Sequence, residues 1–186
     1  MTDVIKPQLD VERVAAQIEQ ASGERKMPPV HLWQPEVCGE IDMRITRDGR
    51  WIHEGGEIKR AAMVRMFSSI LWKETGRYFL VTPVEKVGIQ VDDVPFHFVR
   101  LEVKQGANGQ ELVFTTQTDD VVTASKTHPL RVVINPETGE PSPYLAVRYD
   151  MEGLLHRNLY YELVELAEEH DGEYFVTSCG ERFQIS

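Results

Sequence analysis

The most informative stretch of this chain is Gly76-Arg-Tyr-Phe-Leu-Val-Thr-Pro-Val-Glu-Lys-Val-Gly-Ile-Gln-Val-Asp-Asp93. It holds an apolar strand, a proline break, a Glu-Lys pair, a second apolar strand and two adjacent aspartates. A fainter copy lies at the C-terminus as Gly172-Glu-Tyr-Phe-Val-Thr-Ser-Cys-Gly-Glu-Arg-Phe-Gln-Ile185. Identical residues recur at one constant offset, namely Gly76 with Gly172, Tyr78 with Tyr174, Phe79 with Phe175, Glu85 with Glu181 and Ile89 with Ile185. The sequence therefore predicts a duplicated unit.

Composition limits the classes of partner. The 186 residues suffice for one domain or two small ones, and 41% hydrophobic with 27% charged residues is ordinary for a folded protein. The net charge of −10 comes entirely from the second half, because residues 1–86 hold 13 acidic and 13 basic side chains whereas residues 87–186 hold 17 and 7. A nucleic-acid or anionic membrane surface requires clustered cations, so we expect neither as a main partner. A small phosphate-bearing ligand held by a few arginines of the first half remains compatible.

Cysteine usage and the lack of export signals predict a cytoplasmic location. Cys38 and Cys179 are far apart and outside any C-x-x-C pattern, which argues against a disulfide scaffold or a zinc ribbon. The N-terminus lacks the apolar core of a signal peptide, and no apolar run approaches the length of a membrane span.

Residues 1–29 are predicted to form an N-terminal helix and a linker. Apolar residues spaced at i, i+3, i+4 and i+7 indicate a helix over residues 8–21 that ends at Gly23, followed by a linker over residues 24–29. A single modest apolar stripe leaves two alternatives open, a frayed arm or a helix that docks or dimerises.

Residues 30–91 and 92–186 are predicted as two α+β units, each built around a strand–helix–strand core with antiparallel-rich sheets. In the first unit we expect an extended segment over residues 30–36, strands at 41–45, 51–53 and 78–82, and a helix over 59–72. In the second unit we expect strands at 99–103, 112–116, 121–122, 130–134 and 144–149, and a helix over 154–169. Asp48-Gly49 and Asn108-Gly109 are predicted hairpin turns. Val99, Leu101 and Val103 alternate with charged residues and should face the core.

Several side-chain groups could carry chemistry, although each has a simpler structural explanation. The six histidines show no metal-binding spacing, so we identify no metal site or cofactor. Asp92-Asp93 and Asp119-Asp120 could supply acid–base or magnesium-binding carboxylates, or could cap turns. Glu85-Lys86 could be a solvated ion pair, or Lys86 could meet a ligand anion while Glu85 fixes its position. No nucleophile or nucleotide-loop motif is present, so no residue is assigned as catalytic.

The chain resembles the bacterial family called domain of unknown function 1285 over about residues 30–170. The resemblance rests on Gly39-Glu-Ile-Asp-Met-Arg-Ile45, the Asp48-Gly49 turn with Trp51, Tyr78-Phe-Leu-Val-Thr-Pro-Val-Glu-Lys86, Asp92-Asp93-x-Pro95-Phe96, His128-Pro129-Leu130 and Pro143-Tyr144. It implies a duplicated core of two α+β units, the second similar to pleckstrin-homology-like folds. It also implies a pocket between the units for a nucleotide-type ligand, and a role in signal transduction.

We therefore predict a ligand-binding protein whose site lies between the two units. Cationic side chains would bind an anionic group, carboxylates would accept hydrogen bonds from a sugar or base, and other polar residues would line the site. The candidate site residues lie at strand ends and breaks, and are Arg44, Thr82, Glu85, Lys86, Asp93, Asp120 and His128.

Two alternatives from other classes stay open. A protein–protein adaptor would present the acidic helix face carrying Glu162, Glu165 and Glu169 to a basic partner. A metal-assisted enzyme would use Asp92, Asp93 and a histidine, and is the least favoured of the three.

Overall fold

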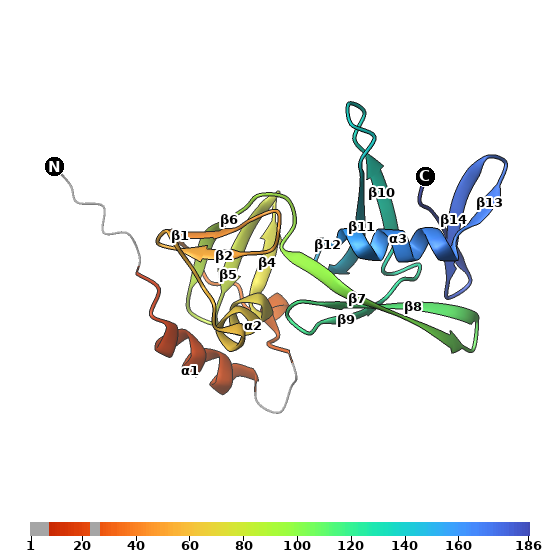
Figure 1. Ribbon diagram of the computed structural model, residues 1–186. Helices are drawn as coiled ribbons and strands as arrows, with labels where there is room; N and C mark the ends of the chain where they lie inside the picture. The colour runs from red at the N-terminus through yellow and green to blue at the C-terminus, as the bar shows by residue number, and fades with distance from the viewer. Residues whose placement is uncertain (1–7, 23–26) are drawn as a thin grey trace. The chain divides into compact units, whose positions relative to one another are not determined.

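Residues 8–22 and 27–186 are described by the computed structural model of this chain. The chain divides into two units, Met1–Asp93 and Val94–Ser186, each of which is described by itself below (Figure 1). The division falls two residues after the boundary expected from the sequence. Among the described residues, no helix is both long and apolar enough to cross a membrane.

The first unit is built on a six-stranded sheet with the order β3-β2-β1-β6-β5-β4. Its elements are α1 (Val11–Ser22), η1 (Val30–Leu32), β1 (Val37–Ile45), β2 (Trp51–His53), β3 (Gly56–Glu57), α2 (Ala61–Ser69), β4 (Leu71–Glu74), β5 (Arg77–Val81) and β6 (Lys86–Val91). β1 and β6 run parallel, whereas the other neighbours are antiparallel. Fully buried Phe67 of α2 stacks on Trp51 of β2 with ring centroids 6.3 Å apart, which fixes α2 against the sheet.

The predicted helix over residues 59–72 is too long. α2 ends at Ser69, and the residues that continue its apolar pattern belong to β4, where Leu71 pairs with Leu80 and Trp72 with Phe79. The helix stop expected at Thr75-Gly76 is instead the tight turn between β4 and β5, with φ of 48° and 76°. Cross-strand pairing outweighs local periodicity here, because both residues gain partners on a neighbouring strand.

The N-terminal helix docks on the first unit. Val14 is only 1% exposed, and Arg13 forms an ion pair with Glu85 in the turn before β6. The segment after the linker is not fully extended as expected, because residues 30–32 form the 3-10 helix η1. The predicted stop at Gly23 and the linker residues 24–26 lie outside the described residues.

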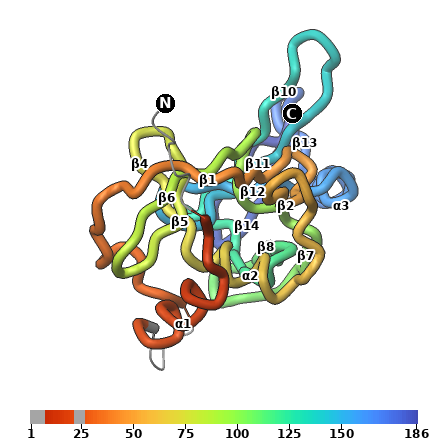
Figure 2. The backbone as a smooth tube through the Cα atoms, turned by 90° about the vertical axis from the view of Figure 1, so that its left-hand side faces the viewer, coloured from red at the N-terminus to blue at the C-terminus, as the bar shows by residue number. Residues whose placement is uncertain are grey.

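The second unit has a curled six-stranded sheet, a helix and a small three-stranded sheet, and fits a pleckstrin-homology-like fold. Its elements are β7 (Phe96–Gly106), β8 (Gly109–Thr116), β9 (Val121–Thr123), β10 (Leu130–Ile134), β11 (Pro141–Arg148), β12 (Met151–Leu155), α3 (Arg157–Leu166), β13 (Glu168–His170), β14 (Glu173–Ser178) and β15 (Glu181–Gln184). The sheet orders are β10-β11-β12-β7-β8-β9 and β13-β14-β15. The β10–β11 hairpin extends beyond the rest of this unit (Figures 1 and 2).

Two predictions for the second unit are wrong in detail. Residues 154–169, which were expected to form one helix, belong to three elements. Leu154 lies in β12 and Glu169 in β13, on either side of α3. The strand alternation also fails on β7, where Val99 and Val103 are 48% and 47% exposed. A register shift between Phe98 and Arg100 changes which side chains face the core.

The duplication is confirmed, although the repeated element order differs from the predicted strand–helix–strand. Each copy is a helix followed by three antiparallel strands, α2-β4-β5-β6 and α3-β13-β14-β15. The pairing registers agree at the offset seen in the sequence, since Phe79 faces Gly88 as Phe175 faces Gln184. The α+β fold with duplicated units is therefore the fold of this chain.

Candidate functional site

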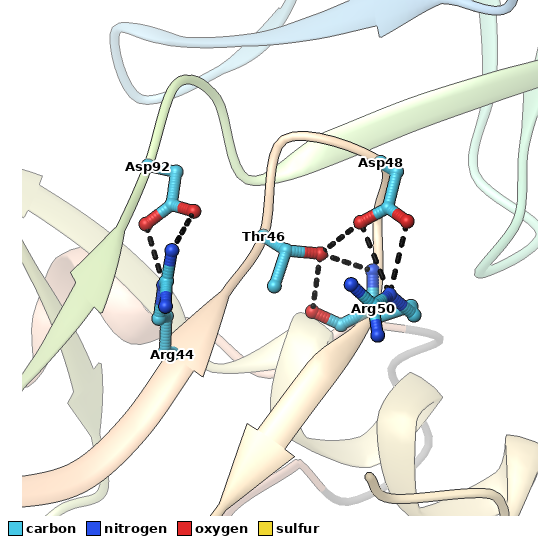
Figure 3. A network of polar contacts seen from close by, with 5 residues as sticks. All are labelled: Arg44, Thr46, Asp48, Arg50 and Asp92. Carbon is cyan, nitrogen blue, oxygen red and sulfur yellow. Dashed lines mark hydrogen bonds and ion pairs between the residues drawn. The ribbon is translucent and has the colours of Figure 1, made fainter.

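Four charged side chains meet at the carboxyl ends of the parallel strands β1 and β6. Arg44, near the end of β1, donates from Nε and Nη2 to the two carboxylate oxygens of Asp92 at 2.7 and 2.6 Å (Figure 3). Arg47 donates to Asp93 at 3.0 Å. The register brings them together, because Arg44 lies beside Gln90, two residues before Asp92. Two of the candidate site residues, Arg44 and Asp93, lie in this cluster. Each of them already forms an ion pair with a residue of opposite charge.

The β1–β2 turn next to this cluster is held by its own polar network. Thr46 Oγ1 donates to Asp48, and it accepts a hydrogen bond from the Arg50 backbone N–H at 3.0 Å (Figure 3). The Thr46 hydroxyl, with a smaller contribution from Arg50, lowers the pKa of Asp48. The hydrogen bonds from Arg44 likewise lower the pKa of Asp92, and those to Asp92 raise the pKa of Arg44. These carboxylates are thus stabilised in their ionised form.

Thr82, Glu85 and Lys86 lie at the opposite end of β6, in and after its turn from β5. Thr82 Oγ1 accepts from the Glu85 backbone N–H at 3.0 Å, so Thr82 shapes the turn. Glu85 forms an ion pair with Arg13, and Lys86 forms an ion pair with Glu74. The two residues therefore do not form the ion pair with each other that was one of the expectations. The Lys86 ammonium also lies 4.7 Å from the centroid of the Phe79 ring.

The structure separates the two cations proposed to bind one anion. Arg44 pairs in register with Gln90, four residues along β6 from Lys86, and four strand residues span about 13 Å. Their side chains also bind different carboxylates, Arg44 that of Asp92 and Lys86 that of Glu74, so the two cations do not converge on one anion site in this structure.

Asp120 and His128 belong to the second unit and have separate surroundings. Asp120 accepts from Arg148 at 2.6 Å, from Thr116 at 3.0 Å and from Thr118 at 2.8 Å. The Asp120 and Arg148 side chains are only 14% and 18% exposed, so this is a largely buried ion pair. His128 Nδ1 lies 3.1 Å from the carbonyl oxygen of Ala146. Within residues 8–22 and 27–186, no group of three His, Cys, Asp or Glu side chains could hold a metal ion.

The outer face of α3 is a surface that the sequence reading partly missed. Tyr161 and Val164 are 55% and 46% exposed on this face of the helix. Arg157 donates to the Tyr161 hydroxyl at 3.1 Å, and Glu162 and Glu165 are exposed as expected. Glu169 is also exposed but lies on β13. The signal for this surface was the spacing of Tyr161 and Val164, which lie one turn apart on the side away from buried Leu159 and Leu163.

Comparisons with known proteins give the family of the chain. The family model "Domain of unknown function (DUF1285), N-terminal domain" matches residues 28–94, and "Protein of unknown function (DUF1285), C-terminal domain" matches residues 95–185. No curated protein matches the chain. A crystal structure of a DUF1285 family protein from Silicibacter pomeroyi DSS-3 is 46% identical, with a TM-score of 0.85 and 96% of each chain covered. Another, from Shewanella baltica OS155, is 28% identical, with a TM-score of 0.51, and covers 66% of this chain and 90% of its own. Because the two family models together match most of the sequence, this chain belongs to the DUF1285 family.

Proposed function

We propose that this chain is a protein-interaction module whose second unit binds a basic partner through the outer face of α3. The observation that carries the proposal is the pair Tyr161 and Val164, 55% and 46% exposed on one side of a well-packed helix. Aromatic side chains are enriched at protein interfaces, where they bury a large area at a low cost in conformational entropy.

The charges around this pair favour a basic partner. Glu162 and Glu165 are exposed on α3, and the exposed β13 strand begins with Glu168. The second half of the chain holds the whole acidic excess of the protein. Such a field speeds encounter with a cationic surface and repels acidic ones.

A pull-down comparison tests this function. Proteins retained by the wild-type chain at low salt should be lost at high salt, because exposed charges are screened. They should also be lost with Tyr161→Ser/Val164→Ser and with Glu162→Lys/Glu165→Lys. Glu54→Lys/Glu57→Lys is the matched control, since it changes the charge equally at exposed residues of the first unit. Equal retention by all four proteins would refute the α3 surface.

A second candidate, a nucleotide-type ligand-binding role in signalling, is favoured by the cluster at the carboxyl ends of β1 and β6. Arg44 and Arg47 reach adjacent aspartates there, with side chains 52% and 58% exposed. An exposed ion pair contributes little net stability, so a polyvalent phosphate could replace a carboxylate on these guanidinium groups. Lys86 lies at the other end of β6 and would not share this anion.

A thermal-shift experiment tests the second candidate. Pyrophosphate and nucleotides should raise the melting temperature of the wild type and have little effect on Arg44→Ala. Arg131→Ala is a well-matched control, because Arg131 binds Glu152 with two hydrogen bonds of 2.8 and 2.6 Å and the same 52% side-chain exposure as Arg44. No shift with any anion, or the same shift in Arg44→Ala as in the wild type, would rule this site out.

A further inference from the structure

The three repeated strands, β4–β6 in the first copy and β13–β15 in the second, have one face of similar composition. In the first copy, Phe79 faces Gly88 and Val81 faces Lys86. Residues directly opposite each other on antiparallel strands share a face, so these four side-chain positions lie together. The equivalent four in the second copy are the pairs Phe175 with Gln184 and Thr177 with Arg182. Both copies also have a cation over the phenylalanine ring. Lys86 lies over Phe79 in the first copy, and Arg182 lies 4.4 Å from the Phe175 centroid in the second.

The two copies differ in how much of this face is covered. In the first copy all four residues are buried, and Phe79 is 3% exposed. In the second copy Phe175 and Thr177 are half-buried, whereas Arg182 and Gln184 are exposed. The same sheet face is therefore covered in one copy and open in the other.

Charged side chains cover part of this face in the first copy. The ion pair of Arg77 with Glu40 lies over Gly88, where an added Cβ would be 3.0 Å from Glu40 Cγ. The edge strand β4 is in contact with η1, and residues 28–30 at this segment are buried. A charged contact thus covers Gly88 on this face, and a proline-containing apolar segment packs on the neighbouring edge strand.

The open face of the second copy carries two carboxylates that the first copy lacks, while Arg182 keeps the positive charge that Lys86 has over the ring. At the offset of the repeat, Glu173 stands where the first copy has Arg77, and Glu168 stands where it has Trp72. Glu168 and Glu173 are exposed. The half-buried Phe175 ring is therefore bordered by two carboxylates, and a basic segment is the complementary partner.

The opposite face of this small sheet is already covered. Val176 and Phe183, which face each other on β14 and β15, are 1% and 9% exposed, and α3 contacts β14. The open face is thus distinct from the outer surface of α3 described above.

We propose that the open face of the β13–β15 sheet, centred on Phe175 and bordered by Glu168 and Glu173, binds a short segment of a partner protein. The segment carries apolar residues against Phe175 and a lysine or arginine against the two glutamates. This goes beyond the proposed interaction through α3, because it adds a second, separate surface that takes a short segment.

The probe is a fluorescent peptide with the sequence Arg25-Lys-Met-Pro-Pro-Val-His-Leu-Trp-Gln34, which joins two cations to the apolar segment that contacts β4 in the first copy. Titrated with the full chain, it should bind saturably and shift the amide NMR signals of β13–β15. Glu168→Lys/Glu173→Lys should weaken binding about tenfold or more, as expected for reversal of close charge pairs. Both glutamates are exposed, so this variant should keep the wild-type melting temperature.

Glu162→Lys/Glu165→Lys is the control, with the same charge change on α3 and an expected loss of less than about twofold. Equal weakening by both variants would show a general charge effect and overturn the proposal. Shifts confined to η1 and β4 would show exchange with the chain's own segment and would also overturn it, as would no saturable binding. Dimers of the wild type that the Glu168→Lys/Glu173→Lys variant abolishes would identify a second copy as the occupant instead. The pull-down with the α3 variants tests a different surface, so its outcome does not depend on the peptide titration.

Discussion

Phe79→Ala is expected to lower the free energy of unfolding of the first unit by about 3–5 kcal/mol, as truncation of a buried phenylalanine does. Phe79 is 3% exposed, and the centroid of its ring lies 4.7 Å from the Lys86 ammonium and 5.2 Å from the Arg77 guanidinium. Its removal leaves a cavity and takes the apolar surface away from both cations. Urea unfolding followed by tryptophan fluorescence measures this unit alone, because all three tryptophans lie within residues 1–93.

The duplicated unit supplies the control for this prediction. Phe175→Ala changes the same position of the second copy, where the ring is half-buried beneath Arg182. Less apolar area is lost, so the loss of stability should be clearly smaller than that of Phe79→Ala. Equal losses in the two variants, with the second unit followed by circular dichroism, would contradict the difference in burial between the copies.

Asp120→Ala is expected to destabilise the second unit by about 3–5 kcal/mol, because breaking a largely buried ion pair leaves a buried guanidinium without this carboxylate. The charge left behind is Arg148, 18% exposed and 4.7 Å above the Phe96 ring, and Thr116 and Thr118 lose their acceptor. Chemical unfolding followed by circular dichroism or by hydrogen exchange of β8 and β11 measures the effect.

Two further variants make the Asp120 result decisive. Asp120→Ala/Arg148→Met removes both charges and should recover part of the lost stability. Asp92→Ala breaks an ion pair with more exposed side chains, 30% and 52%, and should cost less than Asp120→Ala. An unchanged stability of Asp120→Ala would contradict a structural role for this ion pair.

Turns and the repeat are the parts of this fold that were readable from the sequence. Asp48-Gly49 and Asn108-Gly109 specify hairpins through the backbone conformations that Gly and its neighbour adopt, which is a local property. The match of Tyr78-Phe79 with Tyr174-Phe175 indicated the duplication, because both pairs occupy the same register in the three antiparallel strands of their copy. The limits of α2 were missed, since Leu71 continues the helical spacing and only its pairing with Leu80 makes it a strand residue.

The sequence by itself determined the α+β class, the duplicated unit and the uneven charge, because these depend on spacing and composition within short stretches. Only the tertiary structure decided which charges are already engaged and which apolar residues stay exposed. Arg44 meets Asp92 through the parallel register of β1 with β6, and Lys86 meets Glu74 across the β4–β6 region. Phe79 and Phe175 read alike in the sequence, yet one is covered and the other partly open. Burial and ion pairing depend on residues that are far apart in the chain. A local sequence pattern does not indicate which distant residue will lie next to a given side chain.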